Sequence, residues 1–192
     1  MSSEPKTFLT PAEYLDIERK AEYKSEYYQG EMFAMAGASL PHAIIVSNIV
    51  GELRQQLKAM PCGVYSNDLR VQVTHTGLYT YPDVIVCCGT PQLADDYMDM
   101  LLNPTLIIEV LSHSTRDYDR GRKFEHYRTI SSLAEYVTVT QDAPHIERWT
   151  RQPEDRWLLT EFRELNQTVE LASAGCVLAL AEVYAKIDWA KR

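Results

Sequence analysis

The segment from Thr105 to Leu111 (TLIIEVL) is the feature of this sequence that most restricts its fold. Its nearly continuous apolar character is typical of a β-strand covered on both faces, so we expect it in the middle of a sheet. Glu109 interrupts the apolar run. An ionised carboxylate in such a strand is costly unless it is paired or coordinated, so Glu109 requires a chemical explanation.

Patterns along the rest of the chain predict helices and further strands around this one. A capping Thr, a Pro and an acid at residues 10–13 predict a short helix, and apolar residues at four-residue spacing predict another at 41–58. Further helices are expected at 114–130 and 180–187. Strands are expected on both sides of Gly30, from 69 to 73 and 84 to 86 in the central sheet, and at 135–140, 146–149, 157–162 and 168–171. This order predicts an α+β (α/β-like) fold, a mixed central β-sheet flanked by helices, with residues 1–192 forming a single domain.

Composition narrows the class of protein. With 192 residues and 45% hydrophobic residues, the chain can bury one sizeable core. Apolar runs fall short of the roughly 20 residues of a membrane span, and the N-terminus lacks an export signal, so we expect a soluble, cytoplasmic protein without a membrane partner. The spacing of the four cysteines predicts neither a metal site nor a structural bridge, and we expect them to be reduced.

The net charge of −8 argues against a protein that coats nucleic acid through an overall positive field. Contact with nucleic acid would have to be local. The segment 116–128 contains five basic residues against three acidic ones. The candidate phosphate contacts in this segment are Arg116, Arg120 and Arg122.

Two carboxylates and one lysine form the candidate catalytic group. Asp83 follows Pro82 next to an apolar strand run, Glu109 lies inside the next run, and Lys123 follows fourteen residues later. If the two strands are neighbours, Asp83 and Glu109 could share a cation, and their hard oxygen atoms suit Mg²⁺ or Mn²⁺. Such a metal beside a lysine suits hydrolysis of phosphodiesters.

Each of these residues also has a structural interpretation. Asp83 could cap a turn, Glu109 could form a buried pair with an arginine, and Lys123 could form a surface pair with Asp119 on one helix face. The histidines lack paired ligand spacing, so the sequence predicts no zinc site. The tyrosines are expected to pack the sheet, and His42 has a capping or packing role as an alternative to contact with the site.

Several short motifs carry a resemblance over nearly the whole chain. In order, they are Gly30-Glu31, His42, Pro82-Asp83, Ile108-Glu109-Val110-Leu111-Ser112, Ser114-Thr115, Asp119, Lys123, Tyr127 and Glu135-Tyr136. Their order and spacing resemble the Uma-two family of bacterial restriction endonucleases, within the PD-(D/E)XK nuclease superfamily.

The resemblance implies an endonuclease-like fold that tends to form homodimers. It further implies metal ligands at Asp83 and Glu109, a third ligand in the main-chain carbonyl of Val110, and an additional acid at Glu31. Leu111 stands where the superfamily signature has lysine, so Lys123 is the expected substitute. Val137 stands where the family commonly has Trp, which bears on local packing.

These observations predict an endonuclease that uses Mg²⁺ (or Mn²⁺) to hydrolyse phosphodiester bonds, with DNA as the expected substrate. Asp83, Glu109, Lys123 and Glu31 are its expected catalytic residues. Two alternatives stay open: a domain that keeps the nuclease fold for DNA binding or another interaction without cleavage, and a metal-dependent hydrolase of smaller phosphate esters. The sequence contains no base-reading module from which to infer a preferred DNA sequence.

Overall fold

A computed structural model describes residues 8–111 and 119–189, with all their side chains except those of residues 119 and 120. Within these ranges no helix is both long enough and apolar enough to cross a membrane.

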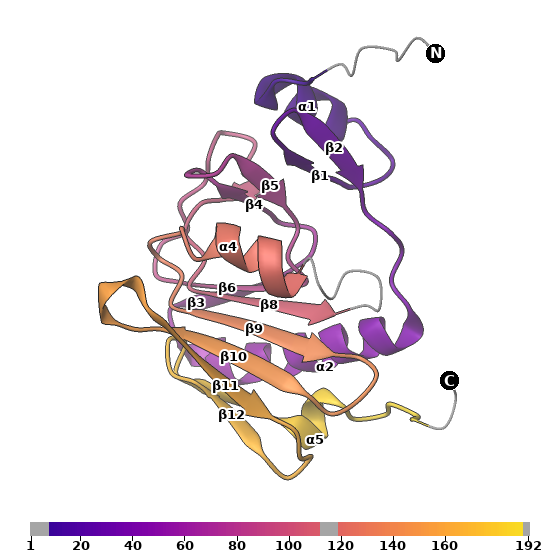
Figure 1. Cartoon of the computed structure of the whole chain (residues 1–192), viewed down its shortest axis with the longest axis vertical. Helices are drawn as coiled ribbons and strands as arrows, with labels where there is room; N and C mark the ends of the chain where they lie inside the picture. The colour runs from indigo at the N-terminus through magenta and orange to yellow at the C-terminus, as the bar shows by residue number, and fades with distance from the viewer. Residues whose placement is uncertain (1–7, 112–118, 190–192) are drawn as a thin grey trace.

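A six-stranded mixed sheet occupies the centre of the molecule (Figure 1). Its strands are β3 (Cys62–Ser66), β6 (Val84–Cys88), β8 (Leu106–Leu111), β9 (Glu135–Thr140), β10 (Ile146–Arg151) and β11 (Trp157–Phe162). The order across the sheet is β11-β10-β9-β8-β6-β3; β8 and β9 run parallel and all other neighbours antiparallel. β8 therefore lies inside the sheet with all its residues buried, as its apolar sequence predicts.

A second, five-stranded sheet lies above the first in the view of Figure 1. It consists of β1 (Ser25–Tyr28), β2 (Glu31–Ala34), β4 (Arg70–Val73), β5 (Leu78–Thr80) and β7 (Met100–Leu101), in the order β2-β1-β5-β4-β7. The prediction that residues 69–73 join the central sheet is therefore wrong. β4 pairs with β5 across a tight turn at Gly77, where φ is +77°, and periodicity cannot tell in which sheet a hairpin lies.

A two-stranded hairpin of β12 (Thr168–Leu171) and β13 (Cys176–Ala179) completes the strands. The helices are α1 (Pro11–Glu18), α2 (Leu40–Gln56), α4 (Phe124–Tyr127) and α5 (Leu180–Val183), with 3₁₀ turns η1 (Leu57–Ala59) and η3 (Pro153–Asp155). The helix expected at 114–130 begins outside the described residues. Its described part is a π-helical turn, η2 (Asp119–Lys123), followed by the single turn of α4.

The two faces of the central sheet pack against different helices. On one face, Ile45, Ile49 and Leu53 of α2 join a core that also includes residues of α5. On the other face, Tyr127 of α4 joins a core that contains Ile107 of β8. Side chains alternate along a strand, so Glu109 points to the same face as Ile107 and lies beneath α4.

The cysteines differ from the sequence prediction. Cys62 of β3 and Cys88 of β6 form a disulfide, because the antiparallel register places them directly opposite each other with Cα atoms 4.0 Å apart. Cys87 and Cys176 are free and buried, as expected of small apolar residues. The prediction that all four are reduced considered only sequence spacing, which does not reveal strand pairing.

Candidate active site

Neighbouring strands bring Asp83 and Glu109 together. Asp83 directly precedes β6, and β6 pairs with β8 so that Val84 lies opposite Ile108. The backbone N–H of Asp83 donates to Oε2 of Glu109 at 3.3 Å, and the N–H of Val110 donates to Oδ2 of Asp83 at 2.8 Å. Both carboxylates are buried. The convergence expected from the two apolar runs is therefore present.

Lys123 points into the same site from the helical segment above the sheet. It is only 7% exposed, and its ammonium lies 3.3 Å from Oε1 of Glu109 and 3.0 Å from Oε1 of Glu26. A lysine that formed only a surface pair would be largely exposed, so this geometry contradicts the surface-pair alternative. The apolar side chain of Leu111 is fully buried at the place where the superfamily has its lysine.

Glu26 is a further acid beside Lys123 in the cavity described below, and Glu31 is not among the residues that line this cavity. Glu31 pairs with Tyr28 beside the Gly30 turn of the β1–β2 hairpin and is half-buried there. Glu26, one strand earlier, is buried and accepts a hydrogen bond from the hydroxyl of Thr80. Glu31 lies opposite Tyr28 and therefore points to the same face of the hairpin as Glu26, so its expected role near the metal stays a prediction.

Two further side chains hold the acids in place. The phenol of Tyr127, which is fully buried, donates to Oε1 of Glu109 at 2.8 Å. Burial, followed by the negative charges of Glu109 and Glu26, raises the pKa of Tyr127 well above its usual value, so the phenol keeps its proton. His42 lies at the start of α2, and its Nε2 is 3.1 Å from Oδ2 of Asp83. Tyr127 and His42 therefore orient the carboxylates of Glu109 and Asp83, respectively.

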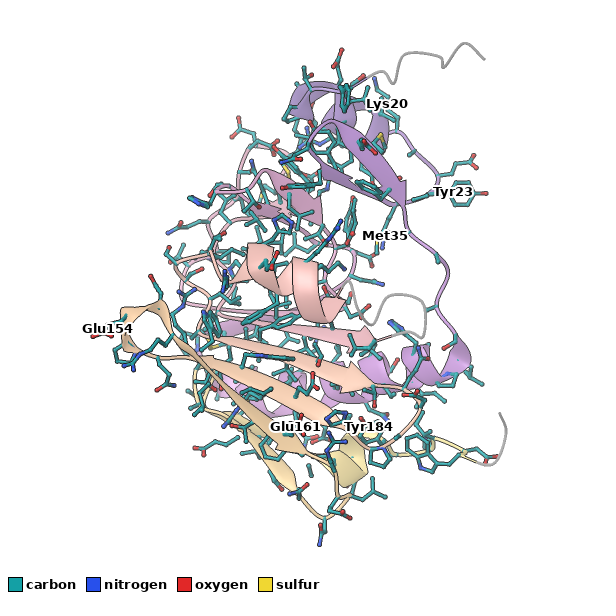
Figure 2. The ribbon with its side chains drawn as sticks, viewed as in Figure 1. Lys20, Tyr23, Met35, Glu154, Glu161 and Tyr184 are labelled. Atoms are coloured by element: carbon teal, nitrogen blue, oxygen red, sulfur yellow. A yellow bond between two sulfur atoms is a disulfide. The ribbon has the colours of Figure 1, made fainter. Side chains whose placement is uncertain are left out.

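The acids, Lys123 and His42 line a cavity of about 390 Å³. One wall is the chain from Phe33 to Ser39, which links β2 to α2, and this link is visible at the right of Figure 1. Figure 2 labels Met35 on this wall, near the end of β2. This wall consists largely of small residues. The polar side chains that line the rest of the cavity are Glu26, His42, Asn67, Tyr81, Asp83, Glu109, Lys123 and Gln141.

The charges of the cavity fit a divalent cation. Three carboxylates (Glu26, Asp83 and Glu109) and one ammonium (Lys123) leave a formal charge of −2 when His42 is neutral. Buried charge of one sign is costly unless it is compensated, and hard oxygen donors favour Mg²⁺ or Mn²⁺. The donor set therefore fits the metal that the family resemblance implies, with Asp83 and Glu109 as the side chains best placed to hold it.

Of the arginines proposed to contact nucleic acid, the structure describes only the side chain of Arg122. Arg122 lies in η2, next to Lys123, and is exposed. Arg116 lies outside the described residues, as does the side chain of Arg120.

Sequence reasoning missed Glu26 and underrated Tyr127 and His42. The signal for Glu26 was a charged residue within the segment SEYY, whose tyrosines favour a strand, but the strand expected before Gly30 began only at Tyr27, two residues after the start of β1. The signal for Tyr127 was its four-residue spacing from Lys123. Both contact Glu109 from above the sheet.

Comparison with known proteins connects this geometry to a family. A family model named Uma2, described as "Putative restriction endonuclease", matches residues 11–181. Two relatives from Synechocystis sp. (strain PCC 6803) cover most of both chains. The uncharacterized protein sll1609 is 36% identical over 164 residues (85% of this chain, 93% of the relative), and the uncharacterized protein slr1290 is 32% identical over 182 residues (95% and 94%).

A solved structure from Anabaena variabilis shares the fold. It is described as "a putative nuclease belonging to DUF820" and superposes with a TM-score of 0.75, covering 92% of this chain and 98% of its own. Sequence identity is 19%, so this similarity concerns the fold alone. The predicted fold class, an endonuclease-like mixed sheet flanked by helices, is confirmed by this match.

Proposed function

The chain belongs to the Uma2 family of restriction-endonuclease-like proteins, and from this premise we propose that it is a metal-dependent endonuclease that hydrolyses phosphodiester bonds in DNA. The observation that carries the proposal is the convergence of Asp83, Glu109 and Lys123 in one cavity. Two buried acids beside a buried ammonium supply the metal ligands and the positive charge that phosphodiester hydrolysis needs.

We assign the metal, Mg²⁺ or Mn²⁺, to the carboxylates of Asp83 and Glu109 and the main-chain carbonyl of Val110. When bound, the metal would activate water and neutralise charge on the phosphate. Glu26 lies across the ammonium of Lys123 from Glu109 and balances part of its charge. Lys123 would stabilise the negative charge that develops on the phosphate oxygens.

The test is cleavage of plasmid and linear DNA by the wild-type chain with Mg²⁺ or Mn²⁺, compared with Glu109→Gln. The amide keeps the shape of the side chain but removes a metal charge, so we expect turnover to fall at least about 100-fold while circular dichroism stays unchanged. Glu22→Gln, which alters an exposed acid in the loop after α1, is the matched control and should cleave like the wild type.

Loss of folded structure in Glu109→Gln would indicate a structural role for this acid. If the wild type binds DNA and cleaves none with either metal, the non-cleaving alternative replaces the nuclease. The non-cleaving alternative is supported by Leu111, an apolar residue at the position where the superfamily has its lysine. Cleavage of small phosphodiesters alone would instead favour a hydrolase of smaller phosphate esters.

We further propose that the protein acts as a homodimer in the cytoplasm. The dimer follows from the family resemblance, and from the acidic charge of −8, which leaves one chain little positive surface for DNA. Light scattering at micromolar concentration should give about twice the monomer mass of 22.0 kDa. A mass equal to that of the monomer would contradict the dimer.

A further inference from the structure

A histidine and two glutamates meet on the central sheet outside the cavity described above. His145 directly precedes β10, and Glu147 of β10 lies directly opposite Glu161 of β11 in the antiparallel register. Their possible ligand atoms, one from each residue, all lie within 4.8 Å of one another. Nε2 of His145 is 3.7 Å from Oε1 of Glu147 and 4.0 Å from Oε2 of Glu161.

Hydrogen bonds fix the backbone of His145 and the carboxylate of Glu147. The hydroxyl of Tyr184 accepts a hydrogen bond from the backbone N–H of His145 at 3.0 Å and donates to its carbonyl at 2.9 Å. The backbone N–H of Thr140 also donates to that carbonyl, at 3.0 Å. The hydroxyl of Thr138 donates to Oε2 of Glu147 at 3.1 Å, which leaves Oε1 as the oxygen that faces the imidazole. The bond from Thr138 to Glu147 is of the kind that orients the carboxylate ligands of metals.

Charge at this position favours a cation. Like charges directly opposite each other on neighbouring strands repel, and Glu147 is buried, with only 9% of its side chain exposed. Arg163 forms an ion pair with Oε2 of Glu161 at 2.8 Å. The side chain of Glu161 is 42% exposed, so an ion could enter from solvent through this residue. Figure 2 labels Glu161 and Tyr184 in the same lower part of the molecule.

The cluster is distinct from the Asp83–Glu109 cavity, although both open on one face of the sheet. Register pairs place Glu109, Thr138, Glu147 and Glu161 in one row across β8, β9, β10 and β11. Two strand spacings separate Glu109 from Glu147, about 10 Å between their backbones. None of the three clustered residues lines the cavity.

We propose that His145, Glu147 and Glu161 form a second metal site, for a borderline divalent cation such as Zn²⁺. One imidazole nitrogen with two carboxylate oxygens suits Zn²⁺, whereas Mg²⁺ prefers oxygen ligands alone. Three protein ligands leave a fourth position for water. This proposal revises the expectation that the chain has no zinc site, because the ligands come from two strands and so show no paired spacing in the sequence.

The test is Zn²⁺ binding by the metal-stripped chain, measured by titration calorimetry in a Glu109→Gln background that disables the other site. We expect one Zn²⁺ per chain, with the Kd raised at least 100-fold by adding either His145→Gln or Glu161→Gln. Glu164→Gln, a nearby exposed acid, is the matched control and should leave the Kd unchanged. Substituted Co²⁺ should show visible absorption that disappears in the same two variants.

Absence of Zn²⁺ binding in the Glu109→Gln protein, or an unchanged Kd in the two variants, would overturn the proposal. The second result would mean that Zn²⁺ binds at another place on the chain. If His145→Gln fails to fold, as judged by circular dichroism, Glu161→Gln decides, because its half-exposed side chain can change without opening the core. The readout is independent of cleavage, so it stands whether or not the protein is a nuclease.

Discussion

Lys123 is the side chain that we propose to supply the catalytic charge from an element other than β8. The superfamily's lysine would stand at position 111 on β8, whereas this chain has a buried leucine there and an ammonium that reaches Glu109 from the end of η2. Position 111 and Lys123 both lie close to Glu109, because β8 runs beneath the segment that carries Lys123. The ammonium of Lys123 therefore lies beside Glu109 although it comes from a different element of the chain.

We expect Lys123→Ala to lower DNA cleavage at least about 100-fold, because the charge that would stabilise the phosphate is lost. The variant also leaves Glu26 and Glu109 without the ammonium between them, which should lower the free energy of unfolding by about 3 kcal/mol without metal. Mn²⁺ should restore part of this stability, since a cation that binds only the folded state stabilises it. Single-turnover cleavage and urea unfolding with and without Mn²⁺ measure both effects.

Lys20→Ala is the matched control, because Lys20 is exposed and pairs with Asp16 within one helix turn. It should change stability by less than about 1 kcal/mol and leave cleavage unchanged. Wild-type turnover in Lys123→Ala would show that Lys123 serves packing and charge balance only.

At the scale of elements, the sequence predicted the strands more reliably than their assembly. The expected strands 135–140, 157–162 and 168–171 match β9, β11 and β12 residue for residue, because β-branched and aromatic alternation is a local signal. The division into two sheets was missed, since it depends on which hairpins fold away from the centre. The pairing of Cys62 with Cys88 was missed for the same reason.

The residues of the candidate site were likewise predicted where the signal is local and missed where it depends on how the strands assemble. Asp83 and Glu109 were found because a charge next to or inside an apolar run stands out in the sequence. Glu26 was not found, because it reaches the site only through the pairing of β1 with β5 and the contact of the second sheet with α4. The chain from Phe33 to Ser39 forms a wall of the cavity by position, and its composition gave no signal of this role.

The helical segment η2–α4 is where we expect DNA to contact the protein. Its buried side holds Lys123 and Tyr127 over Glu109, and Arg122 on its exposed side is therefore close to the cavity. Arg122→Glu should weaken DNA binding and reduce the slope of log K against log salt by about 1. Fluorescence anisotropy at several salt concentrations measures this slope.

Arg54→Glu provides the control, since Arg54 is exposed on α2, which packs on the opposite face of the central sheet. It alters net charge equally and should change the slope far less. Equal slopes for Arg122→Glu and the wild type would remove this segment from the DNA interface.

At the scale of the whole molecule, buried tyrosines make the folded state less stable at alkaline pH. Burial is the main cause that raises the pKa values of Tyr14, Tyr81 and Tyr127 above the usual value. In the unfolded chain these phenols lose protons near pH 10, whereas in the folded protein they keep them to higher pH. Their contribution to stability is thus complete below about pH 10 and is lost as pH rises through the folded pKa values.

We therefore expect the free energy of unfolding to fall by about 1.4 kcal/mol per pH unit for each such tyrosine above about pH 10. Tyr14→Phe should reduce the slope by that amount, because Tyr14 is fully buried and lies away from the catalytic cavity, stacked on Tyr27. Tyr23→Phe changes a phenol that is 78% exposed and should leave the slope as it is. Urea unfolding from pH 9 to pH 11 measures the slopes. A Tyr14→Phe slope equal to that of the wild type would mean that the fold opens locally around this residue, between α1 and the second sheet, before the core of the central sheet unfolds.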